Sequence, residues 1–403
     1  MLELLAPAGN FEKMITAFTY GADAVYLSGK KFGLRAFAGN FDSDELEKAA
    51  IYAHSINKKV YVTLNILAHE NDFDDELKEY LLFLQKIKVD AVLISDLGLM
   101  EFLRQTAPNL TLHVSTQASV LNSYAIKALI RLGAKRIVLA RECSLEEIKK
   151  IRQNIPENIE LEAFVHGAMC ISYSGRCLLS NYLTGRDSNR GECVQACRWE
   201  YCISEVNRKD DKYPIQEDSR GTYILNSKDL NMLDHLKELR DAGVCSFKIE
   251  GRMKSPYYVA NVVNAYRRAI DNLDNLSKPL LDELKSELVK TSHRKYTTGF
   301  YFGAEDKECL ESSYPVQTYE FMALVIGDAN SGKVLIEQRN RFKLGDELEV
   351  LSPNDTFNKV IKVEKMENEL GEEVLDAKNV QEKLYLFTNL PLQKNDILRK
   401  KIR

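Results

Sequence analysis

Short apolar runs alternate with amphipathic stretches along the first 167 residues of the chain. Seven of these runs have the length and β-branched content of buried strands: Glu3–Ala6, Ala24–Leu27, Val60–Ile66, Ala91–Ser95, Thr111–Ser115, Arg136–Ala140 and Glu160–Val165. The intervening stretches, such as Ser43–Ile56, Asp75–Lys86 and Ser144–Gln153, have helical spacing. Ser43 and Ser144 stand where N-cap residues belong.

Strands that alternate with helices are typical of a parallel sheet with right-handed crossovers. With Cys245–Ile249 as an eighth strand, the pattern predicts an α/β fold, a (β/α)₈ TIM-barrel-like domain. The alternative is an open doubly wound sheet. No G-x-G-x-x-G follows the first strand, so no dinucleotide site is indicated.

The chain beyond this predicted barrel changes its pattern. Pro256 begins a helix that continues through Tyr257–Asp271, and Leu280–Val289 is another helical stretch. From Tyr319 onward, short strand-like runs separated by turns predict a small all-β barrel. We therefore expect a catalytic domain over 1–315, with an insert at 168–222, and a C-terminal domain over 316–403. Its basic tail, including Lys394, Arg399, Lys400, Lys401 and Arg403, is a candidate RNA contact.

Polar residues follow nearly every predicted strand. A barrel of this kind has its active site at the carboxyl ends of its strands. The cationic residues there are Arg35, Arg141, Lys248 and Arg252. A guanidinium group can bind a carboxylate with two hydrogen bonds, so this set predicts a site for a small di-acid.

The insert carries four of the eight cysteines, Cys170, Cys177, Cys193 and Cys197. Six, fifteen and three residues separate them in turn. Four thiolates can saturate a tetrahedral zinc ion or an iron–sulfur cluster. Spacing alone does not decide between the two, although neither pair has the two-residue gap usual for zinc, which favours a cluster. Four small buried apolar side chains are the remaining alternative.

His166 lies four residues before Cys170 and two past an apolar run, which places it at the mouth of the predicted barrel. Its titration near neutrality makes it a candidate proton donor. Glu162 and Glu250 are candidate acid or base partners. Glu162 lies one strand length earlier, about 13 Å, and so deeper in the barrel.

Composition is that of an ordinary globular protein, with 45% hydrophobic and 28% charged residues and a net charge of −4. This charge excludes a general nucleic-acid coat, but it allows an RNA enzyme with a local basic patch. No signal peptide and no membrane span are visible, so we expect a cytoplasmic protein with no membrane partner. In a reducing compartment, clustered cysteines indicate ligands rather than disulfides.

Three motifs resemble the signature of the peptidase U32 family, also described as collagenase-like. The first is a single stretch with Glu162, Phe164, His166-Gly167, Met169-Cys170, Ser172-Tyr173-Ser174-Gly175 and Cys177. The second is the opening Leu4-Leu5-Ala6-Pro7-Ala8-Gly9, and the third is Lys248-Ile249-Glu250-Gly251-Arg252. The resemblance covers nearly the whole chain.

This resemblance implies an oxygen-independent RNA hydroxylase that carries a [4Fe-4S] cluster on the four cysteines. It further implies action on the tRNA anticodon loop, with formation of 5-hydroxyuridine at the wobble position. Prephenate would be the co-substrate and source of the hydroxyl group, and a paralogous U32 protein a possible partner subunit.

Two alternatives stay open. One is a related hydroxylase that acts on rRNA. The other is a U32-type protease, although the chain has no His-Glu-x-x-His and no Gly-x-Ser-x-Gly motif. A papain-like pair of Cys170 and His166 would leave three cysteines unexplained.

Overall fold

The computed structural model describes residues 2–34, 39–170, 172–173, 175–199, 203–205, 208–213, 217–218, 221–222, 228–303 and 315–402. Eight parallel strands close into a barrel, in the order β13-β1-β2-β3-β4-β5-β6-β7, with β7 pairing back to β13. They are β1 (Glu3–Pro7), β2 (Ala24–Leu27), β3 (Lys59–Leu64), β4 (Ala91–Ile94), β5 (Leu112–Val114), β6 (Ala134–Val138), β7 (Glu160–Ala168) and β13 (Ser246–Ile249). The predicted fold class is confirmed, and the closed β7–β13 pairing excludes the open sheet.

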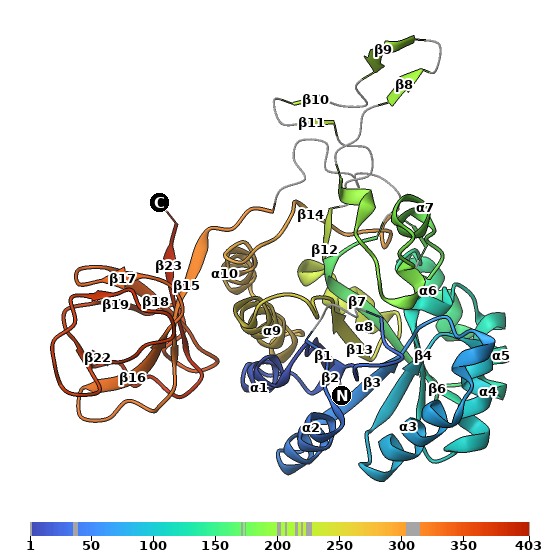
Figure 1. Ribbon diagram of the computed structural model, residues 1–403, viewed down its shortest axis with the longest axis horizontal. Coiled ribbons are helices and arrows are strands. Elements are labelled where there is room, and N and C mark those ends of the chain that lie inside the picture. The colour runs from blue at the N-terminus through green and yellow to red at the C-terminus, as the bar shows by residue number, and fades with distance from the viewer. Residues whose placement is uncertain are drawn as a thin grey trace.

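Helices surround this barrel, as Figure 1 shows. They are α1 (Phe11–Thr19), α2 (Ser43–Ser55), α3 (Asp75–Lys86), α4 (Leu97–Thr106), α5 (Ser123–Arg131), α6 (Leu145–Gln153), α8 (Leu236–Asp241), α9 (Pro256–Asp271) and α10 (Lys278–Leu288). Ser144 caps α6 with a capping box to Glu147, as predicted. The prediction for Ser43 was wrong by one residue, because Asp42 is the N-cap of α2 and pairs with Glu45 in the capping box.

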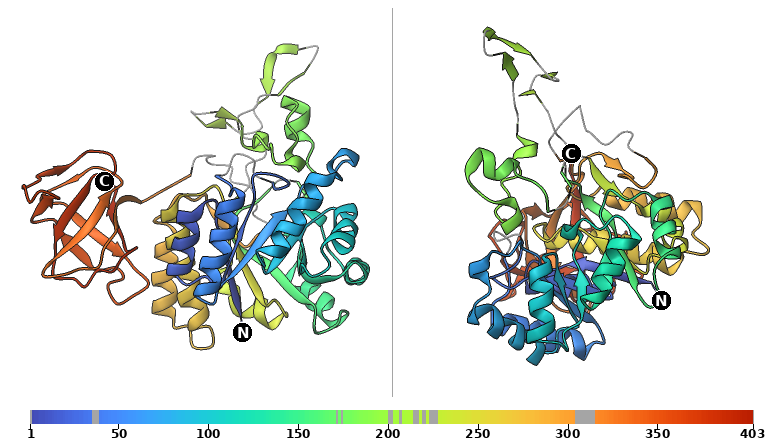
Figure 2. Two further views of the ribbon diagram at one scale, coloured as in Figure 1. Left: turned by 60° about the horizontal axis from the view of Figure 1, so that its bottom comes forward. Right: turned by 90° about the vertical axis from the view of Figure 1, so that its right-hand side faces the viewer.

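The insert follows β7 at the carboxyl ends of the strands and projects from the barrel (Figures 1 and 2). Its elements are α7 (Leu179–Thr184), β8 (Ile203–Glu205), β9 (Arg208–Tyr213), β10 (Glu217–Asp218) and β11 (Gly221–Thr222). β8 and β9 pair antiparallel.

The chain returns to the barrel through β12 (Asp229–Asn231), which pairs antiparallel with β7 and parallel with β14 (Tyr296–Thr297). The aromatic segment after β14 packs on the barrel. Tyr301 is buried, and its hydroxyl donates to the Phe164 carbonyl at 2.7 Å. No helix in the described residues is long and apolar enough to cross a membrane.

The C-terminal domain is a curved antiparallel sheet with its own apolar core. Its strands are β15 (Tyr319–Val325), β16 (Lys333–Gln338), β18 (Glu347–Leu351), β19 (Val360–Lys362), β20 (Met366–Asn368), β22 (Lys383–Phe387) and β23 (Ile397–Lys401), in the order β19-β18-β23-β15-β16-β22-β20. A separate pair joins β17 (Phe342–Lys343) to β21 (Asp376–Ala377). This domain lies beside α9 and α10 (Figure 2).

Three residues of the basic tail, Arg399, Lys400 and Lys401, lie in β23. Arg403 lies outside the described residues, and an RNA contact by the tail stays a prediction. Arg399 lies in β23, is fully buried, and donates to Asn261 at 2.8 Å and to Glu287 at 2.6 Å. Lys400 pairs with Asp346 at 2.7 Å. Buried charges require partners, and the partners Asn261 and Glu287 come from helices of the barrel. Arg399 therefore joins the two domains.

Candidate active site

A cavity of about 410 Å³ lies at the carboxyl ends of the barrel strands, beneath the insert. Strand-end residues line one side of it and the insert lines the other. Eight of the eleven predicted site residues line it: Arg141, Lys248, Glu250, Arg252, Cys170, Cys177, Cys193 and Cys197. Arg35 lies outside the described residues. Glu162 and His166 are elsewhere in the fold.

Arg141 follows β6 and is held from three sides. Its guanidinium donates to the Ala168 carbonyl at 3.0 Å and to the Glu250 carboxylate at 2.9 Å, and it lies 4.0 Å from the centroid of the Phe164 ring. Its Nε is buried and has no hydrogen-bond partner in the described part of the chain. A buried donor without a partner is costly, so this nitrogen is a position where a bound acceptor would be stabilised.

Lys248 and Arg252 line the same cavity from the segment that begins in β13. Lys248 Nζ donates to Glu162 at 2.7 Å and lies 4.6 Å from the centroid of the Tyr26 ring. Arg252 is 4% exposed, and it donates to the Thr63 hydroxyl at 3.0 Å and to the Leu34 carbonyl. Both cations are therefore fixed in place, as a preorganised anion site requires.

Glu162 lies below the cavity, as its strand position predicted. It is fully buried between Lys248 and Arg136, whose NH1 is 3.1 Å from the Glu162 carboxylate. Burial by itself raises the pKa of Glu162, but the charges of Lys248 and Arg136 outweigh that effect, and the pKa is lowered. Glu162 is thus an ionised carboxylate that positions Lys248, and the acid–base role predicted for it has no support in this geometry.

The prediction that His166 lies at the barrel mouth was wrong. The pairing of β7 with β13 shifts by one residue: Phe164 is opposite Lys248, but His166 is opposite Ile249. A one-residue shift turns a side chain to the other face of a sheet. His166 is therefore buried against α9, with its Nδ1 3.3 Å from the Tyr266 hydroxyl.

Burial, together with the charges of His293 and Lys254, lowers the pKa of His166 to about 3. The group is neutral in the folded state and gains a proton on unfolding below about pH 6.5. The stability that it confers is therefore present above pH 6.5 and is lost as pH falls toward 3, at up to about 1.4 kcal/mol per pH unit.

We expect His166→Phe to flatten this pH dependence between pH 6.5 and 4, as measured by urea unfolding at several pH values. His54→Phe is the matched control, because His54 is on the surface and bonds to Asp90. An unchanged slope in the His166 variant would contradict the assignment.

The four cysteines of the insert all line the cavity, but they are not grouped as a complete set of metal ligands. Among the described residues, no group of three or more His, Cys, Asp or Glu is placed to hold a metal ion. The other two described thiols differ from the four. Burial raises the pKa of Cys143 to about 12, and burial also raises the pKa of Cys245. Cys143 belongs to the apolar core and Cys245 is half-buried, and neither lines the cavity.

The insert is fastened to the barrel by polar contacts that the sequence did not reveal. Arg190 forms two hydrogen bonds with Asp72, at 2.8 and 3.0 Å. This hydrogen-bonded contact lowers the pKa of Asp72 to about 2. Gly175, with φ of +75°, approaches so closely that a Cβ would lie 2.3 Å from the Gln117 carbonyl oxygen. These contacts form the roof of the cavity.

Several other residues that line the cavity were not predicted from the sequence. Phe164 and Tyr26 supply rings beside the cations, and Tyr173 and Met253 lie half-exposed at the rim. Phe164 lies two residues after Glu162 on the same strand. Because side chains alternate between the two faces of a strand, the position of Phe164 could have predicted that it faces the same side as Glu162. Lys30 and Lys31 follow β2 but pair with Asp42 and Glu76 on the surface.

Comparison with known proteins identifies the family to which this chain belongs. A family model described as "Peptidase family U32" matches residues 9–311, and one for the "Peptidase family U32 C-terminal domain" matches residues 317–399. The chain belongs to the peptidase U32 family. The predicted resemblance is thereby confirmed.

Three curated relatives are informative. The chain is 40% identical to "tRNA hydroxylation protein P1" of Bacillus subtilis over 356 residues, 87% of this chain and 83% of that protein. It is 37% identical to "tRNA hydroxylation protein P" of Escherichia coli over 416 residues, 92% of this chain and 90% of that protein. It is 39% identical to an Escherichia coli 23S rRNA 5-hydroxycytidine synthase over 270 residues, 67% of this chain and 39% of that protein.

Proposed function

We propose that this protein is an RNA-modifying enzyme that hydroxylates a uridine of tRNA. The observation that carries the proposal is the likeness, over most of both chains, to proteins named for tRNA hydroxylation. The cavity supports it, because fixed cations on the strand ends face four thiols on the insert. The finer product, 5-hydroxyuridine at the wobble position of the anticodon loop, follows from the family resemblance.

For the co-substrate we propose a small dicarboxylate, prephenate, as the source of the hydroxyl group. Arg141 and Arg252 would receive its carboxylates, since guanidinium groups match carboxylates in geometry and charge. Phe164 and Tyr26 offer ring faces to its carbon skeleton. Glu250 orients Arg141 through their 2.9 Å contact and is the carboxylate placed to exchange a proton at this site.

For the cofactor we propose a [4Fe-4S] cluster held by Cys170, Cys177, Cys193 and Cys197, with zinc as the alternative. The donor set fits in type and number, because thiolates are the usual ligands of such clusters and all four line one cavity. When bound, the cluster would supply electron-transfer or Lewis-acid chemistry beside the substrate.

The RNA is proposed to approach from the insert side. Tyr173 is 51% exposed and lines the cavity, and Tyr182 on α7 is 86% exposed. Exposed Arg176 lies between them in sequence. Aromatic rings with a nearby cation bind unstacked bases, and an enzyme that acts on a base must first remove it from its stack.

The geometry gives little support to a protease. His166 does not line the cavity that Cys170 lines, so the two do not form a papain-like pair. A general base must reach the proton that it abstracts.

Nucleoside mass spectrometry of a strain that lacks the gene tests the proposed function. We expect loss of a hydroxylated uridine from purified tRNA and an unchanged rRNA profile. A change confined to rRNA would favour the rRNA alternative, and no change in either RNA would contradict hydroxylation.

Iron and sulfide analysis of anaerobically purified protein tests the cofactor. We expect about four of each per chain, with loss of most of both in Cys193→Ser. Cys245→Ser is the matched control, because Cys245 does not line the cavity. Zinc without sulfide would select the alternative.

A further inference from the structure

The outer face of the C-terminal sheet carries two aromatic rings on one strand. Residues alternate along β22, so that Leu384 and Leu386 are buried while Lys383, Tyr385 and Phe387 lie on the opposite face. The register places Lys333 opposite Phe387, and Glu367 opposite Tyr385. We call the set Lys333, Lys365, Lys383, Tyr385 and Phe387 the aromatic face.

Cations flank both rings of the aromatic face. Lys333 Nζ lies 4.4 Å from the centroid of the Tyr385 ring and 5.9 Å from that of Phe387. Lys365 Nζ lies 4.4 Å from the Phe387 centroid, on the other side. Glu367 pairs with Lys365 at 2.7 Å, and Glu337 pairs with Arg339 at 2.9 Å. These two carboxylates therefore each have a cationic partner.

This face lies at the end of the sheet away from its apolar contacts with the barrel. Leu351 of β18 and Ile397 of β23 pack into the apolar core of the barrel, and Arg399 of β23 bonds to its helices. β16, β22 and β20 form the other end of the sheet. At that end Arg339, which follows β16, pairs with Glu12 of α1 at 2.8 Å. The two domains are thus joined at both Arg399 and Arg339.

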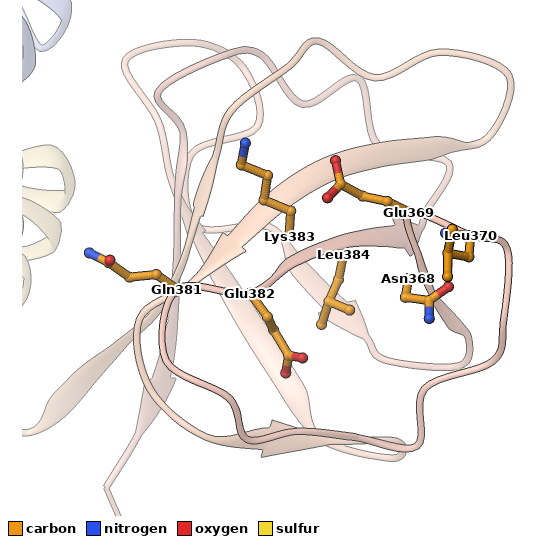
Figure 3. Close-up of a pocket in the computed structure, with 7 residues that line it drawn as sticks. All are labelled: Asn368, Glu369, Leu370, Gln381, Glu382, Lys383 and Leu384. Carbon is orange, nitrogen blue, oxygen red and sulfur yellow. The ribbon is translucent and has the colours of Figure 1, made fainter.

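A cavity of about 480 Å³ continues from the aromatic face at its Lys383 end (Figure 3). It is lined by Asn368, Glu369, Leu370, Gln381, Glu382, Lys383 and Leu384. Lys383 offers an ammonium group at this end, beside the carboxylates of Glu369 and Glu382, while the Gln381 side chain points away from the other lining residues (Figure 3). Ammonium groups bind phosphates.

We propose that the aromatic face binds unpaired nucleotides of the RNA substrate, away from the nucleotide that is modified. The inference rests on the proposed function, since its occupant is the same RNA. Paired rings flanked by lysines match the requirements of an unpaired strand: bases stack on the rings, and the lysines neutralise phosphates. The two ammonium groups now lie over the rings and would move to the phosphates when bases stack.

Fluorescence anisotropy with a labelled twelve-nucleotide oligouridylate tests the proposal on the full chain. We expect Tyr385→Ser/Phe387→Ser to raise Kd about thirtyfold, equivalent to about 2 kcal/mol at 1.4 kcal/mol per tenfold change. Val380→Ser is the matched control: Val380 is 89% exposed in the same domain, outside the aromatic face, and its variant should bind within twofold of the wild type. Thermal unfolding confirms that each variant is folded.

A second variant keeps both rings. Lys333→Ala/Lys365→Ala should reduce the slope of log K against log salt by about 1.4, because each phosphate contact with a single strand contributes about 0.7. Photocrosslinking with a 4-thiouridine oligonucleotide should label the tryptic peptide of residues 384–394.

Unchanged Kd and salt slope in these folded variants would overturn the inference, as would a crosslink elsewhere or no binding by the wild type. Failure here is distinguishable from failure of the proposed function. If the gene deletion removes the hydroxylated nucleoside while these variants bind normally, only this inference fails. If the variants lose binding but no nucleoside is lost in the deletion strain, only the proposed function fails.

Discussion

Arg141→Ala is expected to reduce RNA hydroxylation by at least about a hundredfold in cells at equal protein level. Arg141 lines the cavity and has a buried nitrogen without a partner in the described part of the chain, so it combines a fixed position with capacity to bind an acceptor. Its removal also leaves the carboxylate of Glu250 without its 2.9 Å partner. Loss of a charge-assisted hydrogen bond costs about 1.5–3 kcal/mol, and the loss of alignment adds to it.

Arg141→Lys separates the effect of charge from that of geometry. A lysine keeps the charge but cannot form the forked contact with Ala168 and Glu250. We therefore expect little recovery of activity. Arg104→Ala is the matched control, since Arg104 pairs with Glu101 on the surface. Full activity in Arg141→Ala, measured by nucleoside mass spectrometry, would remove Arg141 from the site.

Glu162→Gln is expected to destabilise the fold by about 3–5 kcal/mol, the usual cost of removing one partner from a buried ion pair. Glu162 is fully buried and neutralises Lys248, while Arg136 also bonds to Glu3 and Glu160. Without the Glu162 carboxylate, the Lys248 ammonium loses its 2.7 Å partner in a site that is only 3% exposed. Urea unfolding at pH 7 measures the difference in unfolding free energy.

The double variant Glu162→Gln/Lys248→Met identifies the cause. If the cost comes from an uncompensated charge, removing Lys248 as well should recover a large part of the lost stability. Activity should remain low, because Lys248 lines the cavity. Glu146→Gln, on the exposed face of α6, should change the unfolding free energy by less than about 0.5 kcal/mol. Additive losses in the double variant would contradict the ion-pair account.

Local patterns carried the prediction of the barrel and of most of its site. β2 and α3 were predicted to the residue, because an apolar run and an amphipathic stretch each depend only on neighbours in sequence. Arg141 and Glu250 follow directly after strands, and parallel strands end at one edge. Their meeting, at 2.9 Å, was therefore implied by their positions.

Such local patterns could not predict contacts between segments that are distant in sequence. Arg190 lies close to the cysteines in sequence, yet its hydrogen-bond partner is Asp72, 118 residues away. Arg399 resembles a solvated tail residue, but its partners Asn261 and Glu287 lie on two helices of the barrel. A charged side chain binds whichever opposite charge the fold brings near, and its own sequence neighbours do not specify that partner.

The sequence by itself determined the alternation of strands and helices, the polar strand ends and the four thiols of the insert, since these depend on residue type and period alone. Only the tertiary structure decided which side chains face the cavity. A one-residue shift between β7 and β13 left Phe164 at the cavity and turned His166 away from it. Strand register depends on the pairing partner, so the direction of a side chain is a property of two segments together.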